Sequence, residues 1–362
     1  MAGAAVEHNP EPNLVDVSNL RIVEIGTPHM AAAFPRQTQN FVPMPVDPGT
    51  GGTTLSVAKL PQLYRALRAP DLSLIVCRPG YLAPWQGTLL IRALFDRRAW
   101  QGYPRFGPAM APHMLRLPVT APIAVIDTED IPYINSTDLH LLSRCRLYFK
   151  RELPPDRWRL FTRTAHRGLP TPRFRRRSRL GPLLDKLRPI SLGLPGGWTD
   201  MPQVGLEKTA DVFFAGSIEG TSTIRKAGTA ELLALRDRGF RIDLPEGRLP
   251  PQEFYRRCAQ AWITWSPEGL GWDCFRHYEA LGCGSVPLIN QPTIERYQPL
   301  RDGVHALYYE PEPGGLTGAI ETALADKDRL RAIARNGKAH VLAHHSMTAI
   351  ANHVIQSTLG SV

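Results

Sequence analysis

The chain has 362 residues, of which 43% are hydrophobic and 21% are charged, and its formal net charge is +10. This composition is typical of globular proteins and argues against a wholly disordered chain, and the length is sufficient for two α/β domains with separate cores. No run of about 18 apolar residues is present, so no membrane span is expected. Residues 1–18 are acidic and contain proline, which favours a flexible tail over a secretory signal.

The first half of the chain alternates short apolar runs with helical patterns. Apolar runs that are typical of buried strands occupy residues 21–26, 71–80, 122–130 and 146–153. Helical patterns follow at residues 84–99 and 136–145, the second after a Ser/Thr/Asp cluster that suits a helix N-cap. Strands that alternate with helices indicate a mainly parallel sheet with both faces covered. We therefore expect an N-terminal domain over residues 19–153.

Residues 154–205 break this alternation, because they are dense in proline, glycine and arginine. We interpret them as an interdomain connection. Nine arginines lie between Arg157 and Arg179, a density that suits an anionic lipid surface, an anionic acceptor or nucleic acid, or alternatively a solvated connector without a ligand. The five cysteines are widely spaced and include no C-x-x-C pair, which predicts a reducing, cytoplasmic compartment and no zinc site.

A second alternating unit begins at residue 206. Its predicted strands are residues 211–217, 241–244, 262–269, 285–290 and 305–310. Its predicted helices are residues 224–239, 251–261, 272–284, 316–325 and 328–343. Gly239 is expected to close the first of these helices from its C′ position, where a left-handed backbone is common. We expect a C-terminal domain over residues 206–345, followed by a tail or helix over residues 346–362.

The most informative stretch is residues 265–290, WSPEGLGWDCFRHYEALGCGSVPLIN. It combines a strand, a glycine loop, a short helix that carries Glu279, and a second strand. Glycines let the backbone approach a ligand closely, and a helix N-terminus favours anionic oxygen. Two alternatives remain open: Glu279 and Arg276 form only a surface ion pair on one helical face, or Gly282 and Gly284 only stop the helix.

This stretch resembles the nucleotide-binding signature of GT-B glycosyltransferases, in particular exostosin-like and related bacterial enzymes with group 1 donor domains. The matching motifs are Ser266-Pro267-Glu268-Gly269, then Arg276-His277-Tyr278-Glu279-Ala280-Leu281, then Gly282 to Ile289. The strand at residues 211–217 with Arg225 after it, and the Asp302-Gly303 turn, are similar to other parts of such donor domains. The resemblance covers residues 205–345. It implies two Rossmann-like domains that face a cleft.

The resemblance also implies the roles of several residues in donor binding. Glu279 would bind the ribose hydroxyls of a nucleotide sugar, and Arg276 would support Glu279 or touch phosphate. The diphosphate would face Arg225, Lys226 and the backbone around Gly216, Ser217, Gly282, Gly284 and Ser285. Retaining enzymes of this type often carry two glutamates with seven residues between them. Glu268 and Glu279 have ten residues between them, so retention or inversion stays open.

Sugar transfer requires stabilisation of the leaving diphosphate and, for inversion, a base for the acceptor hydroxyl. We expect arginine or lysine to provide the first without a metal, since no Asp-x-Asp motif follows a strand. For the base we favour His29, which follows the first strand, and then Asp130. No cofactor is expected, because the nucleotide sugar is a co-substrate. The acceptor is expected to be a saccharide or a lipid-linked molecule, and the enzyme to contact the anionic inner face of a membrane peripherally.

Two other classes of function fit parts of the sequence. A nicotinamide-dependent oxidoreductase would share the α/β halves, but the first strand is not followed by Gly-x-Gly-x-x-Gly. A nucleic-acid-binding or scaffold protein would use the arginines of residues 157–179, but no recognition helix or sheet of exposed aromatics is evident. We therefore predict a glycosyltransferase with no nucleic-acid partner.

Overall fold

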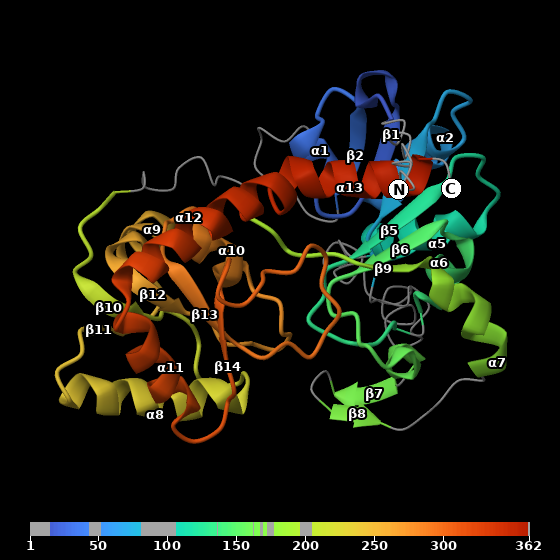
Figure 1. Ribbon diagram of the computed structural model, residues 1–362. Coiled ribbons are helices and arrows are strands. Elements are labelled where there is room, and N and C mark those ends of the chain that lie inside the picture. The colour runs from blue at the N-terminus through green and yellow to red at the C-terminus, as the bar shows by residue number, and fades with distance from the viewer. Residues whose placement is uncertain are drawn as a thin grey trace, which may run out of the picture.

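The computed structural model contains two parallel sheets, one in each half of the chain (Figure 1). It describes residues 15–42, 52–80, 106–135, 137–161, 163–166, 169–171, 177–195 and 205–360. The predicted helix over 84–99 lies outside the described residues, as do residues 1–14 of the predicted tail and parts of the predicted connection. The prediction of an α/β fold with two sheets is confirmed.

The first sheet has the strand order β3-β2-β1-β4-β5-β6-β9, and all its neighbouring strands pair in parallel. Its strands are β1 Ile22–Ile25, β2 Thr38–Val42, β3 Thr53–Thr54, β4 Leu74–Cys77, β5 Ile123–Asp127, β6 Leu147–Lys150 and β9 Leu187–Pro189. Every residue of β1, β4 and β5 is buried, as expected for central strands that are covered on both faces. The four predicted strands correspond to β1, β4, β5 and β6.

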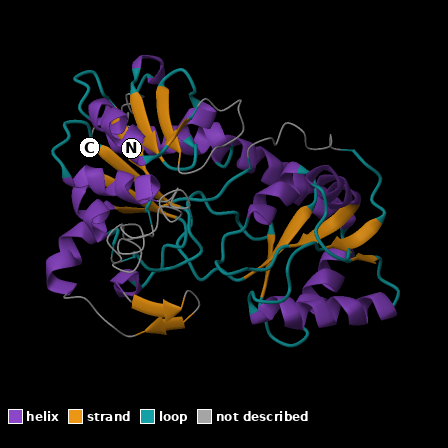
Figure 2. Ribbon diagram, turned by 180° about the vertical axis from the view of Figure 1, so that it is seen from behind, coloured by secondary structure: helices purple, strands orange, loops and turns teal. Residues whose placement is uncertain are grey.

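Helices cover both faces of this sheet (Figure 2). They are α1 Met30–Ala33, α2 Leu60–Leu67, α5 Phe106–His113 and α6 Leu139–Arg144, and the short α7 Arg177–Leu180 lies farther along the chain. One core combines the strands with α2, α5 and α6, and a second core combines them with α1 and a helix from the C-terminus. An antiparallel hairpin, β7 Arg163–His166 with β8 Leu169–Thr171, lies apart from both sheets.

The second sheet has the order β11-β10-β12-β13-β14 and is also parallel. Its strands are β10 Ala210–Phe213, β11 Ile242–Asp243, β12 Ala261–Trp265, β13 Val286–Asn290 and β14 Leu307–Tyr309. Its helices are α8 Thr223–Asp237, α9 Pro251–Gln260, α10 Phe275–Gly282, α11 Gly315–Leu324 and α12 Lys327–His344. Gly239 has φ +95° directly after α8, which confirms its predicted C′ position.

The chain crosses between the sheets twice, once after β9 and once after α12. Helix α13 (Met347–Leu359) returns to the first sheet and buries Ile350, Val354 and Ile355 against β1 and β6. At the crossing, the backbone of Leu194 donates to the carbonyl of His345 at 2.8 Å. The predicted C-terminal helix is therefore part of the N-terminal core.

Two segments outside residues 19–153, the predicted N-terminal domain, also contact that domain or its C-terminal helix. Strand β9 lies inside the predicted connection of residues 154–205 but pairs with β6 in the first sheet. Val15, inside the predicted tail, exchanges backbone hydrogen bonds with the side chain of Gln356. Among the described residues, no helix combines the length and the apolarity that a membrane crossing requires.

Candidate functional site

The second sheet has a topological switch point between β10 and β12. The chain leaves β10 toward β11 on one side and returns through β12 on the other side. Ligands of open parallel sheets bind outside the carboxyl ends of the strands at such a point, where adjacent loops diverge. The loops that follow β10 (214–217) and β12 (266–271) are therefore the expected ligand-binding loops of this domain.

Arg225 connects these two loops. It lies in the first turn of α8 and is only 7% exposed. Its Nε donates to the carbonyl of Glu268 at 2.8 Å, and its Nη1 donates to the carbonyl of Ser217 at 2.9 Å. Both acceptors are neutral carbonyls, so these two hydrogen bonds pair the guanidinium with no carboxylate.

Arg276 places a second guanidinium beside the first. It lies on α10, stacks 5.0 Å from the ring centre of Phe214, and donates from Nη2 to the carbonyl of Ala215 at 2.8 Å. Its Nε and Nη1 are buried without a hydrogen-bond partner among the described residues. Burial lowers the pKa of Arg276, and the nearby positive charge of Arg225 adds to this effect. An oxyanion that reached these nitrogens would offset both costs.

Two glycines allow the loops to lie directly against the guanidiniums. A Cβ at Gly216 would lie 2.6 Å from Nη2 of Arg276, and a Cβ at Gly269 would lie 2.8 Å from Nη2 of Arg225. Contacts this short do not occur with real side chains, so any other residue at either position would displace the loop or the guanidinium. The two glycines thus allow the guanidiniums to occupy their present positions.

Glu268 forms a polar network at the same edge. Its Oε1 accepts a hydrogen bond from Ser222, the N-cap residue of α8, at 2.9 Å. Asn290, at the carboxyl end of β13, accepts from the backbone N–H of Glu268 at 2.9 Å and donates to its Oε2 at 3.2 Å. Sequence reasoning did not place Ser222 or Asn290 in the site. The only available signal was the position of Asn290 at the end of an apolar run.

Glu279 lies one helical turn after Arg276 on α10 and is partly buried. The hydroxyl of Tyr255 on α9 donates to its Oε1 at 3.4 Å. Burial raises the pKa of Glu279, while the positive charge of Arg276 and the Tyr255 hydrogen bond act in the opposite direction. The structure therefore brings Glu279, Arg276 and Arg225 into one electrostatic group next to Gly216 and Ser217.

Gly282, Gly284 and Ser285 do not belong to this group, and the structure does not bring them to the switch point. They form the turn between α10 and β13, which lies at the amino edge of the sheet. There, Ser285 is fully buried and bonds the hydroxyl of Thr264 at 2.8 Å, and the carbonyl of Gly284 accepts from Lys208 at 2.8 Å. A parallel sheet separates its amino and carboxyl edges by the length of a strand.

Two other residues that were predicted to bind the sugar donor are exposed. Ser217 lies in the loop after β10, where its hydroxyl donates to the carbonyl of Glu219 at 3.1 Å. Lys226 follows Arg225 on α8. Because successive helical residues point about 100° apart, Lys226 faces a different direction from Arg225. Contact of Lys226 with a ligand stays a prediction.

The first sheet has its own switch point, between β1 and β4. His29, the N-cap residue of α1, lies in the loop after β1, and its Nε2 is buried without a partner among the described residues. Burial, together with the charge of Arg78, lowers the pKa of His29 to about 4. The imidazole is therefore neutral at pH 7 and retains a free lone pair.

Glu24 organises the same loop from within β1. Its carboxylate is 1% exposed and accepts backbone hydrogen bonds from His29, Met30 and Ala31 at 2.7, 2.9 and 3.0 Å. Burial raises the pKa of Glu24, and these three hydrogen bonds oppose the shift. A single carboxylate inside the apolar run of residues 21–26 was the sequence signal for this role, which sequence reasoning missed.

Asp130, the second candidate base, belongs to a joint between the two halves of the chain. It forms an ion pair with Arg151, whose Nε also donates to Glu152 at 3.1 Å. Glu152 in turn accepts from the backbone N–H groups of Trp272 and Asp273 at 2.9 and 3.0 Å. The loop after β12 is thus attached to the carboxyl edge of the first sheet.

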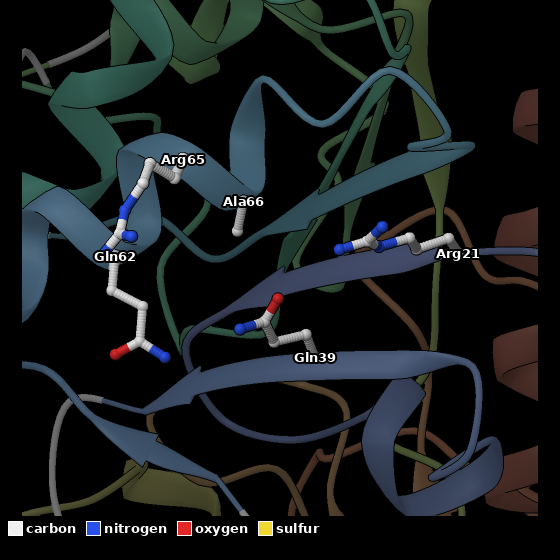
Figure 3. Close-up of a pocket in the computed structure, with 5 residues that line it drawn as sticks. All are labelled: Arg21, Gln39, Gln62, Arg65 and Ala66. Carbon is white, nitrogen blue, oxygen red and sulfur yellow. The ribbon is translucent and has the colours of Figure 1, made fainter.

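A shallow polar hollow lies elsewhere on the first half of the chain (Figure 3). It is lined by Arg21, Gln39, Gln62, Arg65 and Ala66, between α2 and the amino ends of β1 and β2. Arg21 is ion-paired with Asp71 at 2.5 Å. Because the hollow opens near the amino edge of the sheet, it is separate from both switch points.

Within the described parts of the chain, no cluster of three or more His, Cys, Asp or Glu side chains is arranged to hold a metal ion. Metal independence itself stays a prediction. The arginine-rich segment of residues 157–179 falls largely on residues whose side chains are not described. Its predicted contact with an anionic surface therefore also stays a prediction.

Comparisons with known proteins agree with this arrangement. Residues 238–356, which include most of the second sheet and all of α10, match a family model described as glycosyl transferase-like. No curated protein sequence matches the chain.

Several solved structures are similar over nearly the whole chain. Sucrose-phosphate synthase from Thermosynechococcus elongatus is 14% identical over 93% of this chain and 98% of its own, with a TM-score of 0.51. HepE from Anabaena, solved in complex with UDP, is 13% identical over 93% and 99%, with a TM-score of 0.51. A glycosyltransferase from Rickettsia africae is 8% identical over 95% and 100%, with a TM-score of 0.54. The chain therefore has the GT-B fold, with two Rossmann-like domains and a glycosyl transferase-like region in the C-terminal one.

Proposed function

We propose that the protein is a metal-independent glycosyltransferase that moves a hexose from a nucleoside-diphosphate sugar to a saccharide or lipid-linked acceptor. The observation that carries this proposal is the pair of buried guanidiniums, Arg225 and Arg276, at the switch point of the second sheet. Cleavage of the bond between sugar and diphosphate leaves negative charge on the diphosphate oxygens. Fixed cations in a site with little water stabilise that charge.

The donor would be held by residues of both loops at this switch point. Arg225, Arg276 and the backbone of Gly216 and Ser217 would bind the diphosphate, with the N-terminus of α8 adding its dipole and Lys226 adding charge from outside. Two fixed guanidiniums replace the charge that a metal ion would supply, which is why we propose no metal. Glu279 would accept hydrogen bonds from the ribose hydroxyls, since a carboxylate can accept two such bonds at once.

The acceptor would bind to the first domain and be activated by His29 or, as the second candidate, by Asp130. A neutral imidazole at pH 7 can accept a proton from a hydroxyl. The widely spaced cysteines favour a cytoplasmic enzyme, and the arginines of residues 157–179 favour peripheral contact with an anionic membrane. We propose that the enzyme acts in polysaccharide biosynthesis. The finer resemblance to exostosin-like enzymes rests on the motifs of residues 265–290.

Titration of the full chain with UDP, followed by calorimetry, tests this proposal. UDP is the chosen probe because HepE was solved with it. The variant Glu279→Ala is expected to weaken UDP binding about 100-fold, because two hydrogen bonds to a charged acceptor are lost. The matched control is Glu321→Ala, which removes a glutamate ion-paired with Arg238 on the outer helices of the same domain.

Circular dichroism would verify that both variants keep the fold. Equal UDP affinity in the wild-type chain and in Glu279→Ala would remove Glu279 from the donor site. A wild-type chain that binds no nucleoside diphosphate from a panel of bases would refute the proposed function as a whole. Turnover in EDTA, measured with the sugar form of the nucleotide that binds, would test metal independence.

A further inference from the structure

Arg78 occupies the centre of the switch point of the first sheet. It follows β4 directly, and its side chain is 21% exposed. Its Nη1 donates to the hydroxyl of Thr27 in the loop after β1, and its Nη2 donates to the hydroxyl of Thr128 in the loop after β5 at 2.5 Å. One guanidinium thereby joins the loops of three adjacent strands at the carboxyl edge, where ligands of such sheets bind.

The positive charge of Arg78 is compensated in part, by an ion pair with Glu129. The carboxylate of Glu129 is 3.8 Å away, beyond hydrogen-bond distance, and 33% exposed. Glu24 is close enough to interact electrostatically, but its oxygens are already occupied by three backbone N–H groups of α1. His29 is neutral at pH 7 because burial lowers its pKa to about 4. Among the described residues, Arg78 therefore has one long ion pair, with Glu129, and donates no hydrogen bond to a carboxylate.

Thr27 and Thr128 add two hydrogen-bond donors to those of Arg78. Each hydroxyl accepts a hydrogen bond from Arg78, which leaves the hydroxyl hydrogen of Thr27 and of Thr128 to donate elsewhere. The guanidinium retains further N–H groups beyond the two it uses. A partly exposed arginine flanked by two hydroxyl donors is suited to a tetrahedral, doubly charged oxyanion, because guanidinium and phosphate form charge-assisted, bidentate hydrogen bonds.

Hydrogen bonds connect the surroundings of Arg78 to the second domain. The carbonyl of Thr128 accepts from Nη1 of Arg151 at 2.8 Å. Arg151 bonds Glu152, and Glu152 holds the backbone of Trp272 in the loop after β12. A short hydrogen-bond chain thus links Arg78 to the loop that carries Gly269.

We propose that Arg78, with Thr27 and Thr128, binds a phosphate group of the acceptor. This inference rests on the proposed function, which places the acceptor in the first domain. The phosphate can come from a free sugar phosphate or from the head group of a lipid-linked acceptor, since both present the same oxyanion. In either case Arg78 determines acceptor specificity rather than donor binding.

The test is calorimetric titration of the full chain, saturated with UDP, with three probes: glucose 6-phosphate, glucose, and phosphatidylcholine vesicles containing phosphatidic acid, whose head group is a terminal phosphate monoester. The variant Arg78→Gln is expected to weaken binding of the phosphate-bearing probe at least tenfold and to leave UDP affinity unchanged. Arg78→Lys, which keeps the charge but loses the bidentate geometry, should give an intermediate value. The matched control is Arg36→Gln, an exposed arginine between α1 and β2 at the opposite edge of the same sheet.

Preference for glucose 6-phosphate would identify a soluble acceptor, and preference for the anionic vesicles would identify a lipid-linked one. Binding of neither probe by the wild-type chain, or unchanged binding in Arg78→Gln, would overturn the proposal. If Arg78→Gln does not fold, Arg78→Lys and Thr128→Val must both weaken binding for the proposal to stand. UDP affinity, measured first in each variant, distinguishes a failure here from a failure of the donor site.

Discussion

The two switch points have the same strand topology but bury side chains of opposite charge. In the second domain, Arg225 and Arg276 are held under glycine loops by backbone carbonyls, and the second has two buried nitrogens without partners in the described structure. In the first domain, the buried group is a carboxylate, Glu24, which is satisfied by three N–H groups, and the arginine is partly exposed. At one edge, two guanidiniums bond to neutral carbonyls beside a single partly buried carboxylate, Glu279. At the other edge, the buried carboxylate of Glu24 positions a loop.

This difference indicates a division of labour. A leaving diphosphate gains charge during the reaction, so its site benefits from cations that are fixed and desolvated in advance. An acceptor hydroxyl loses a proton, so its site benefits from a neutral base close to a cation that orients the substrate. The predictions below test this division, beginning with the largest expected effect.

Removal of the base in the first domain should affect turnover and not donor binding. His29→Ala is expected to reduce kcat about 100-fold or more, because general base catalysis contributes about 10² to 10⁴. UDP affinity should change less than twofold, since His29 lies at the other switch point. Steady-state kinetics and calorimetry on the same preparation would measure both. His140→Ala, on α6 of the same domain, controls for the loss of a partly buried histidine. A normal kcat would leave Asp130 as the candidate base.

Removal of an arginine at the switch point of the second domain should instead weaken UDP binding. Arg225→Met is expected to weaken UDP binding about 10- to 100-fold, because charge-assisted hydrogen bonds to an anion contribute about 1.5–3 kcal/mol. Arg238→Met, at the exposed end of α8, removes the same charge away from the switch point and should leave UDP affinity unchanged. If both variants bound UDP equally weakly, the effect would be long-range charge and not a specific site.

The buried histidines near the two switch points should make stability depend on pH. Burial lowers the pKa of His29 to about 4 and that of His277 to about 3, from an ordinary value of 6.5. The unfolded chain therefore binds more protons below pH 6.5, and the folded state loses about 1.4 kcal/mol per histidine for each pH unit down to the folded pKa. Burial raises the pKa of Asp273 to about 6, which acts in the opposite direction and offsets part of the loss.

Urea unfolding at pH 7 and at pH 5 would measure this change in the free energy of unfolding. We expect lower stability at pH 5, and a smaller difference between the two pH values in His277→Gln. The ring of His277 is bonded at both nitrogens, to Ser266 at 2.7 Å and to the carbonyl of Trp272 at 3.0 Å, so this variant should also be less stable at pH 7. Equal stability at both pH values would show that the buried rings accept protons without cost.

Much of the fold was predictable, because central strands of a parallel sheet are apolar on both faces. The runs at residues 21–26 and 285–290 stand out as strands for this reason. Strands β2, β3 and β9 were not predicted: β2 begins with the polar Thr38 and Gln39, β3 has two residues, and β9 ends in Pro189 at the edge of the sheet. The edge strands β3 and β9 need not be apolar on both faces, so their sequences carry a weaker signal. Strand β2 lies next to the edge strand β3, and its first two residues are only partly buried.

The candidate site was only partly predictable. Local spacing along residues 265–290 was enough to single out Gly269, Arg276 and Glu279 in a loop followed by a helix. The same local pattern also singled out Gly282, Gly284 and Ser285, which lie at the opposite edge of the sheet. A glycine at the end of a helix has the same local sequence signal whichever edge it occupies.

The sequence by itself determined the two α/β halves, the glycine loop and the helix that carries Glu279, because burial of both faces and helical spacing are local properties of the chain. Only the tertiary structure decided which loops share an edge, that Arg225 and Arg276 meet under Gly216 and Gly269, and that α13 completes the first core. Those outcomes depend on strand order and on contacts between residues far apart in the chain. Local sequence patterns specify neither the strand order nor these long-range contacts.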